Sequence, residues 1–302
     1  MANTREIKIR LRGVRKTRQI TRAMKMVATV KLRRAQAALA GSRPYAERML
    51  AIVSDLMANL DLSGGESPFF ARRPVRKMLL IVISSDRGLC GSMNANILRR
   101  AMRCIESPDG PGSALARPEV HVMPVGKKAR ECYRAREASP APGAQYSTVE
   151  GASFDGLDAS ALGASCCSFF LKGEYDRIDI CYNETVAALQ HRAACITLFP
   201  LDPAQLLAGM KDSVRTLAGA IFEPVAGAMA NDVVRAYVAS RVRQIVLGAA
   251  VAEHAARMLM MDLATKNADE LMAGMQLTMN KLRQLAITNE LADITTGAEA
   301  LA

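Results

Sequence analysis

The two ends of this 302-residue chain read as very long helices of opposite charge, and this pattern limits the possible folds more than any other feature. Residues 1–50 hold fourteen Lys and Arg but only Glu6 and Glu47, a net charge of +12. From Glu253 onward, seven acids stand against four bases. Two such helices cannot bury their apolar seams alone. We therefore expect them to pack antiparallel against each other as a long coiled coil.

The first predicted helix runs from Thr4 to about Leu60 and is ended by the turn Ser63-Gly64-Gly65. Its apolar residues recur at helical spacing, as one buried face requires. We expect Pro44 to kink or break this helix, because proline cannot donate a backbone hydrogen bond. The apolar positions assigned to its seam are Ile7, Leu11, Val14, Ile20, Met24, Val27, Ala46, Leu50, Val53, Met57 and Leu60.

The last predicted helix starts just after Pro224, a residue suited to a first turn, and runs to about Thr296. Its apolar residues alternate in steps of four and three, the rhythm of a coiled-coil seam. The positions assigned to that seam are Val238, Val242, Ile245, Ala249, Ala252, Ala256, Leu259 and Leu263, followed by Ala273, Leu277, Ile287, Leu291 and Ile294.

The middle of the chain alternates strands and helices. Met78–Ile83 is a continuous apolar run, which is typical of a strand buried on both faces. The βα alternation predicts an α/β domain with a mainly parallel sheet. We place this domain at 75–223, between helical segments 1–62 and 224–302. The other strands are expected at Val120–Val125, Ile178–Tyr182 and Cys195–Phe199, and the helices at Asn94–Ile105, Lys127–Ala138 and Ala159–Leu171.

The sequence offers no recognisable catalytic or metal-binding constellation. The turn Ser84–Ser92 follows a strand and opens a helix, so its amides could hold an anion. It lacks the phosphate-loop lysine, however, which weakens a nucleotide-binding enzyme as an alternative. The seven cysteines and three histidines show no ligand spacing and suggest reduced core thiols, so we expect no cofactor and no metal. The longest apolar runs, such as Ile245–Ala252, are too short to span a bilayer.

The basic first helix has three possible partners. It could bind nucleic acid through phosphates, lie on an anionic membrane surface, or face an acidic protein surface. The apolar seam runs through the basic stretch, so one face must pack on protein. Tyr45 is the only aromatic residue among the first 50, which disfavours base stacking. A basic coiled-coil nucleic-acid binder stays as the alternative from another functional class.

Four motifs, taken in order, closely resemble the gamma subunit of F-type ATP synthase, and the resemblance covers essentially the full length. It implies a coiled coil of the terminal helices with a Rossmann-like α/β domain at its foot. The motifs are Thr17–Ala28 (TRQITRAMKMVA), Ser42–Glu47 (SRPYAE), Ser85–Gly91 (SDRGLCG) and Arg283–Leu291 (RQLAITNEL).

The resemblance also implies a function and partners. The chain would be the central rotary shaft inside a ring of three alpha and three beta subunits, with its foot on the epsilon subunit and the membrane c-ring. It would couple ion-driven rotation to ATP synthesis or hydrolysis at the beta subunits, without an active site of its own or any nucleic-acid partner. No chloroplast-type cysteine insert is recognisable, which favours a peripheral protein on the cytoplasmic face of a bacterial inner membrane.

Eight residues take subunit-contact or coupling roles from the matching motifs. The resemblance implies that most of them transmit rotation to the catalytic subunits, while Arg87 and Cys90 lie where the α/β domain approaches a beta subunit. A tip bearing Ile287, Leu291 and Ile294 could turn in an apolar sleeve. The eight residues are Met24, Arg87, Cys90, Arg257, Arg283, Gln284, Thr288 and Glu290.

Overall fold

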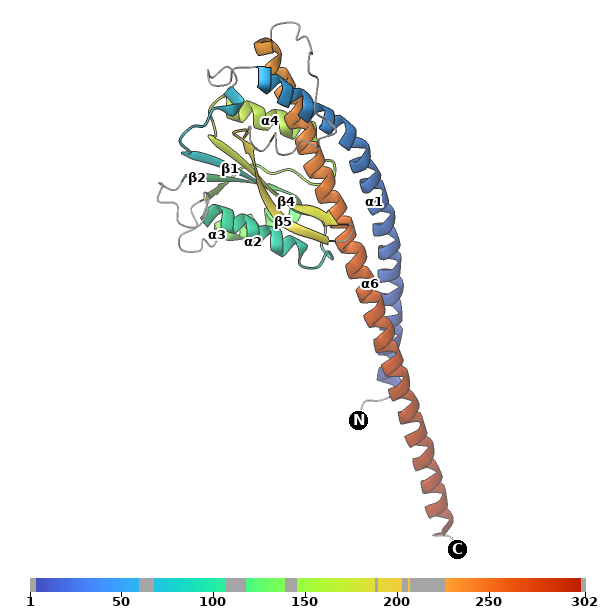
Figure 1. Cartoon of the computed structure of the whole chain (residues 1–302). Coiled ribbons are helices and arrows are strands. Elements are labelled where there is room, and N and C mark those ends of the chain that lie inside the picture. Colours follow the sequence, from blue (N-terminus) through green and yellow to red (C-terminus); the bar gives the residue numbers. More distant parts are fainter. Residues whose placement is uncertain are drawn as a thin grey trace. The chain divides into compact units, whose positions relative to one another are not determined.

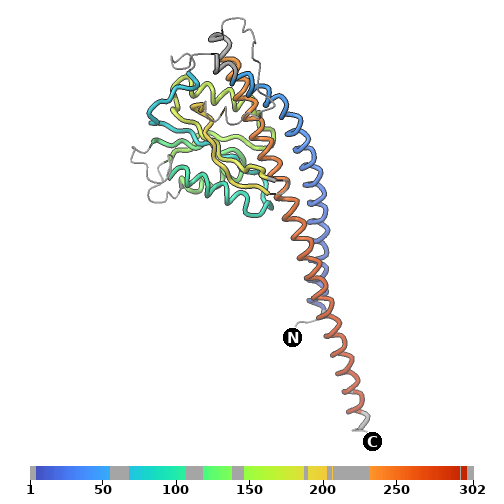
Figure 2. The backbone as a smooth tube through the Cα atoms, in the orientation of Figure 1, coloured from blue at the N-terminus to red at the C-terminus, as the bar shows by residue number. Residues whose placement is uncertain are grey.

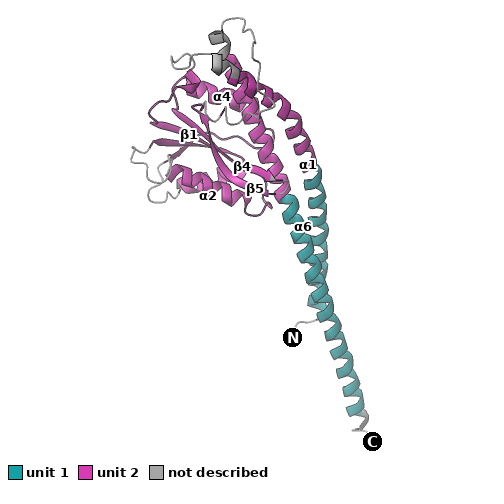
Figure 3. Ribbon diagram, viewed as in Figure 1, with its two compact units in different colours: residues 1–30, 257–302 teal, residues 31–256 magenta. Residues whose placement is uncertain are grey.

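A computed structural model describes residues 4–59, 68–106, 118–138, 146–187, 190–202, 206 and 226–299 of the chain (Figure 1). The chain divides into two compact units (Figure 3). Residues 1–30 and 257–302 form unit 1, and residues 31–256 form unit 2. Helix α1 (Thr4–Asn59) and helix α6 (Ala226–Glu299) each supply residues to both units. The division of the chain at residues 62 and 224 stays a prediction.

Unit 2 is built on one five-stranded sheet with the strand order β3-β2-β1-β4-β5. The first four strands are parallel to their neighbours, and β5 runs antiparallel to β4. The predicted mainly parallel sheet is therefore confirmed. The strands are β1 (Lys77–Ile83), β2 (Glu119–Val125), β3 (Tyr146–Thr148), β4 (Arg177–Ala187) and β5 (Gln190–Phe199).

Helices cover both faces of this sheet, and β1 shows why its sequence is apolar throughout. Leu79, Ile81 and Ile83 pack with α4 and α6 on one face. Met78, Leu80 and Val82 pack with α2 and α3 on the other. Every second side chain thus enters a different core, as a doubly covered strand requires. The helices of the domain are α2 (Met93–Glu106), α3 (Lys127–Ala138) and α4 (Ala159–Leu171), with a short 3₁₀ turn, η2, at Pro68–Phe70.

Within unit 2, helix α6 packs against both the sheet and helix α4. Val238, Val242 and Ile245 are buried in the core they share with the sheet. The predicted rhythm of these positions is therefore correct, but within unit 2 it faces the α/β domain. Gly163 of α4 explains the close fit, because a Cβ placed there would lie 3.0 Å from the Cα of Ala239.

Helix α1 is continuous where a break was possible. It runs through Pro44 without interruption (Figure 2). A proline removes a single hydrogen bond from the helix ladder. Leu32 before it and Met49 after it are both buried, so packing on either side holds the helix together. Of the expected kink or break at Pro44, the break is therefore wrong, and the kink stays a prediction. The predicted boundaries at Ser63–Gly65 and Pro224 lie outside the described residues.

In unit 1, α1 and α6 pack as an antiparallel pair. On α1, the least exposed positions recur in steps of four and three residues. Ile7, Thr21 and Ala28 are the most deeply buried of these positions. On α6, the least exposed positions recur with the same spacing, and Met261 and Ala268 are buried members of that series. This alternation is the pattern of a coiled-coil seam.

The seam in unit 1 includes the predicted positions Ile7, Leu11 and Val14 but differs from the prediction further along both helices. Ile20 and Val27 of α1 are exposed, as are Leu259 and Leu263 of α6. The prediction followed apolar residues alone, whereas the seam includes polar positions that such a reading passes over. At these four positions the predicted register is therefore displaced by one or two residues. The predicted seam positions Met57 and Leu60 carry no described side chain.

Candidate functional surfaces

A layer of polar pairs crosses the coiled coil of unit 1. Arg18 bonds Asp269 at 2.6 Å, and Lys25 bonds Asp262 at 2.6 Å. Between these ion pairs, the hydroxyl groups of Thr21 and Thr265 lie 2.9 Å apart. Bases of α1 thus meet acids of α6, in agreement with the opposite charges of the two ends. Since each pair fits only one alignment of the helices, the layer fixes their register.

Asp262 is the most heavily bonded acid of this layer. Hydrogen bonds from Lys25 and then Lys266 hold the pKa of its carboxyl group below the ordinary value, against a smaller effect of burial. The Lys266 ammonium lies 3.3 Å from it, one helical turn along α6. Asp262 therefore stays ionised to a lower pH than an isolated aspartate does.

Beyond this layer, the end of α6 forms an exposed tip, which we define as residues 283–299. The pairing of residue 18 with 269, and of 25 with 262, places Thr4 opposite about residue 283. Helix α6 continues to Glu299, past that level. Four of the predicted coupling residues lie on the tip, and all four are exposed. They are Arg283, Gln284, Thr288 and Glu290.

The tip carries large apolar side chains in the open. Ile294 is 67% exposed and Leu291 is 59% exposed. Arg283, Ile287, Glu290 and Ile294 are spaced by four, three and four residues, so they share one face. That face combines one base and one acid with two isoleucines. Exposed apolar groups gathered in this way mark a surface that another protein covers.

Met24 and Arg257 lie deeper than the tip residues. Met24 is half-buried on α1, next to Lys25 of the polar layer. Arg257 on α6 is only 9% exposed, so it is buried within the chain. The tip residues are thus brought together on one exposed stretch, while these two are not part of it. A coupling role for either stays a prediction.

The turn between β1 and α2 places Arg87 and Cys90 in different environments. Arg87 is exposed. Cys90 is 3% exposed and packs with Met93 and two alanines of α6. The Asn94 amide donates to the Cys90 sulfur at 3.2 Å and fixes it in the turn. Cys90 therefore anchors the turn in the core, and the turn places Arg87 at the surface.

Leu89 is a candidate that sequence reasoning missed. It lies in the same turn with φ at 64°, in the left-handed region that side chains other than Gly, Asn or Asp seldom adopt. It is also 59% exposed. A leucine that is both strained and exposed is a candidate for contact with a partner. Its position between Gly88 and Cys90, inside a recognised motif, was the available signal.

Asp86 ties this turn to its surroundings. Burial disfavours the ionised carboxyl, but bonds from the Asp155 amide, the Ser153 hydroxyl and the Lys127 amide outweigh it and lower the pKa. The Lys127 bond is 2.8 Å long and lies at the start of α3. A protein carboxylate thus occupies the position where a helix start could bind a phosphate. The helix start that Asp86 occupies is that of α3, whereas the turn itself opens α2.

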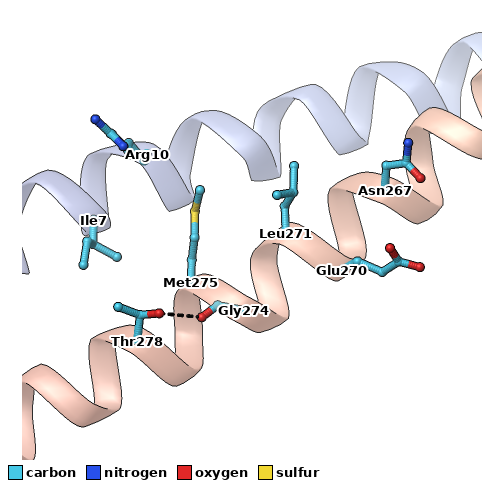
Figure 4. A pocket seen from close by; sticks show the side chains of 8 residues that line it. All are labelled: Ile7, Arg10, Asn267, Glu270, Leu271, Gly274, Met275 and Thr278. Atoms are coloured by element: carbon cyan, nitrogen blue, oxygen red, sulfur yellow. Dashed lines mark hydrogen bonds between the residues drawn. The ribbon is translucent and has the colours of Figure 1, made fainter.

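A groove lies along the coiled coil of unit 1 (Figure 4). Ile7 and Arg10 of α1 face six residues of α6 across it, with a cavity volume of about 890 Å³. Gly274 leaves part of it open, since no atom lies within 4 Å of where its Cβ would be. The Thr278 hydroxyl donates to the Gly274 carbonyl of its own helix at 3.0 Å. The groove suits side-chain packing by a partner better than bond-making chemistry.

Comparison with known proteins over the whole chain decides what these surfaces belong to. A family model described as ATP synthase matches residues 3–301. The ATP synthase gamma chain of Chlorobium luteolum is 35% identical over 309 residues, covering 100% of this chain and 99% of that one. The chain belongs to the ATP synthase gamma-chain family. The gamma chain of Chlorobaculum tepidum is 36% identical over 303 residues, with the same coverage of both chains.

Solved structures agree with this assignment at the level of the fold. A chain of the Euglena gracilis mitochondrial ATP synthase matches with a TM-score of 0.61 and 20% identity, covering 99% of this chain and 94% of that chain. A chain of the Tetrahymena thermophila mitochondrial ATP synthase, from its central stalk and c-ring, has a TM-score of 0.57 and 24% identity. It covers 81% of this chain and 99% of its own length.

Family membership makes the chain a subunit of an enzyme complex. Among the described residues, no helix combines the length and the apolar character needed to cross a membrane. The expected α/β fold with long terminal helices agrees with the gamma stalk. The roles of the eight individual contact residues stay predictions.

Proposed function

We propose that the chain is the central rotary shaft of an F-type ATP synthase and has no active site of its own. It transmits ion-driven rotation of a membrane c-ring to ATP synthesis or hydrolysis at the beta subunits. The exposed tip of α6, in a chain that belongs to this family over its full length, carries the proposal. In this proposal the surrounding subunits catalyse the reaction. The shaft is asymmetric, so it contacts each catalytic subunit differently.

The tip has the surface that a bearing needs. Ile287, Leu291 and Ile294 are exposed and carry no charge. They can therefore slide against an apolar sleeve without breaking strong directional bonds. Arg283 and Glu290 add charges that meet different partner groups at different angles. Contact of this kind changes with rotation and can bias the affinity of each catalytic site in turn.

Unit 2 supplies the second set of contacts in this proposal. Arg87 and Leu89 project from a turn that Cys90 and Asp86 hold rigid, and we assign this turn to a beta subunit. The remaining partners are the alpha subunits of the ring, the epsilon subunit and the c-ring. The complex lies, by this proposal, on the cytoplasmic face of a bacterial inner membrane, with the chain attached peripherally.

Co-expression with the alpha and beta subunits of the same source tests the proposal. We expect one copy of the chain to co-elute with three alpha–beta pairs on size-exclusion chromatography. This complex should hydrolyse ATP faster than alpha and beta without the chain. Elution of the chain alone, or salt-sensitive association with nucleic acid in its place, would contradict the proposal and favour the basic nucleic-acid binder.

A further inference from the structure

Three cysteines far apart in the sequence converge in unit 2. Cys104 lies in the last turn of α2, Cys181 in β4 and Cys195 in β5. Their three Sγ atoms all lie within 4.8 Å of one another. The spacing in sequence gave no sign of this cluster, because the fold alone brings the three elements together.

The sheet register explains the convergence. Cys181 and Cys195 are direct partners across the antiparallel β4–β5 pair, so their side chains emerge on the same face. Helix α2 covers that face and brings the Cys104 Sγ to 4.0 Å from the Cys181 Sγ. Three sulfurs bound to one metal at about 2.3 Å lie about 3.8–4.0 Å apart. The cluster is already close to this geometry.

Hydrogen bonds among the three thiols shift their pKa values in opposite directions. Hydrogen bonds from Cys181, then from Cys195, lower the pKa of the Cys104 thiol, while burial opposes them and Arg100 and Arg177 add smaller favourable effects. The bond to Cys104 conversely raises the pKa of Cys181. Among the three thiols, Cys104 is thus the one whose surroundings most favour the ionised form.

Cys166 and Cys167, which are neighbours in the sequence, differ from the three clustered cysteines. Burial raises the pKa of Cys166 to about 12 and that of Cys167 to about 11. Both lie in the apolar core beside Phe170. They are inert packing groups, as the sequence suggested, and the contrast marks the three-thiol cluster as chemically distinct.

We propose that Cys104, Cys181 and Cys195 bind one soft metal ion through three thiolates, with monovalent copper and zinc as the two ions of suitable chemistry. Thiolates select such ions over magnesium, calcium or manganese. Copper can be held by three sulfurs alone, and zinc would add a water molecule as its fourth ligand. On binding, the ion replaces the protons that the cysteine thiols carry, and these protons are released to solvent.

No acid competes as a protein ligand in the part of the chain that the structure describes. The nearby Asp179 is 2% exposed, and its two oxygens each bond Arg177 at 3.0 Å. Cys195 is only half-buried, which leaves a path for the ion. A bound ion would tie the end of α2 to the antiparallel edge of the sheet and raise the thermal stability of the chain by mass action.

Titration of the reduced, metal-free full-length chain tests the proposal. One arm uses zinc against a chromophoric chelator, and the other uses monovalent copper under anaerobic conditions. We expect one ion per chain in at least one arm, a higher melting temperature, and three sulfur neighbours at about 2.3 Å by X-ray absorption. The arm that reaches this stoichiometry identifies the ion.

Matched variants separate this site from general thiol binding. Cys104→Ser and Cys181→Ala should each abolish stoichiometric binding, whereas Cys132→Ser on α3 should retain it. Circular dichroism verifies that each variant is folded, and Cys104→Ser carries the test alone if Cys181→Ala does not fold. Binding that survives Cys104→Ser, or no uptake in either arm, would overturn the proposal. So would a stable disulfide within the cluster whose reduced form takes up no ion.

Discussion

The Lys25 ammonium lies 2.6 Å from the Asp262 carboxylate, joining two residues that are 237 positions apart in the sequence. Each end of the chain supplies one charge, and the pair lies at the edge of the seam, beside the contact between the Thr21 and Thr265 hydroxyl groups. Two helices that buried only apolar groups could slide past one another by a heptad. The pair therefore fixes how far α6 extends beyond α1, and with it the length of the exposed tip.

The first prediction concerns acid stability. Because the folded-state pKa of Asp262 is lowered, its contribution is present above the unfolded value of about 3.9 and is lost as pH falls through the lower folded value. Asp262→Asn should therefore flatten the fall in melting temperature of the full chain below about pH 4. Circular dichroism melts across this range measure it, with Glu270→Gln, an exposed acid, as control. An Asp262→Asn curve that superimposes on the parent curve would contradict this prediction.

The second prediction compares two glycines in helices of unit 2. Gly163→Ala places a methyl 3.0 Å from the Ala239 backbone, so it should lower the free energy of unfolding by about 1–3 kcal/mol. Gly248→Ala meets no atom within 4 Å and should raise it by about 0.5–1 kcal/mol, because alanine favours the helix. Urea unfolding of the two variants measures both. Stabilisation by both changes would mean that α4 and α6 pack less closely than described.

The third prediction concerns Leu89. Leu89→Gly should raise the free energy of unfolding of the chain by about 1 kcal/mol, because glycine removes the left-handed strain. It should also lower ATP hydrolysis by the assembled complex, since an apolar contact with a partner is lost. Leu89→Asn, which tolerates this backbone conformation, separates the lost contact from added flexibility. Gained stability with unchanged activity in both variants would remove Leu89 from the interface.

Much of the fold could be predicted from local patterns. The bounds of α3 and α4 match the predicted helices, and β1 differs by a single residue. Strand β3 was missed, because Tyr146–Thr148 is too short to show periodicity. Strands β4 and β5 were predicted too short. Their polar extensions are held by backbone pairing of a hairpin, to which side-chain hydropathy is a poor guide.

The surfaces were predictable where one helix presents them and unpredictable where two segments must meet. Arg283 and Glu290 were found from a local motif, and both are exposed as a contact requires. Thr21 and Thr265 were not recognised as seam residues, because only the facing helix shows that their hydroxyls pair. The three-thiol cluster, likewise, depends on a sheet register that no single segment encodes.

The fourth prediction concerns the tip. Arg283→Ala should lower ATP-driven ion pumping by about fivefold or more, as expected for loss of about 1 kcal/mol of contact energy. Lys281→Ala is the matched control, because this exposed base lies two residues away and points to the opposite side of α6. Pumping into inverted vesicles measures both. Equal losses would show that only the net charge of the tip matters.

Rotation of the chain within its complex is the most direct test of the shaft proposal. The assembled alpha–beta ring is fixed to a surface, and a bead attached to α3 of unit 2 is followed while ATP is supplied. The proposal predicts rotation in one direction, and removal of the chain from Leu285 onward should weaken it while unit 2 stays folded. A bead that remains still while the same complexes hydrolyse ATP would contradict the role of central shaft.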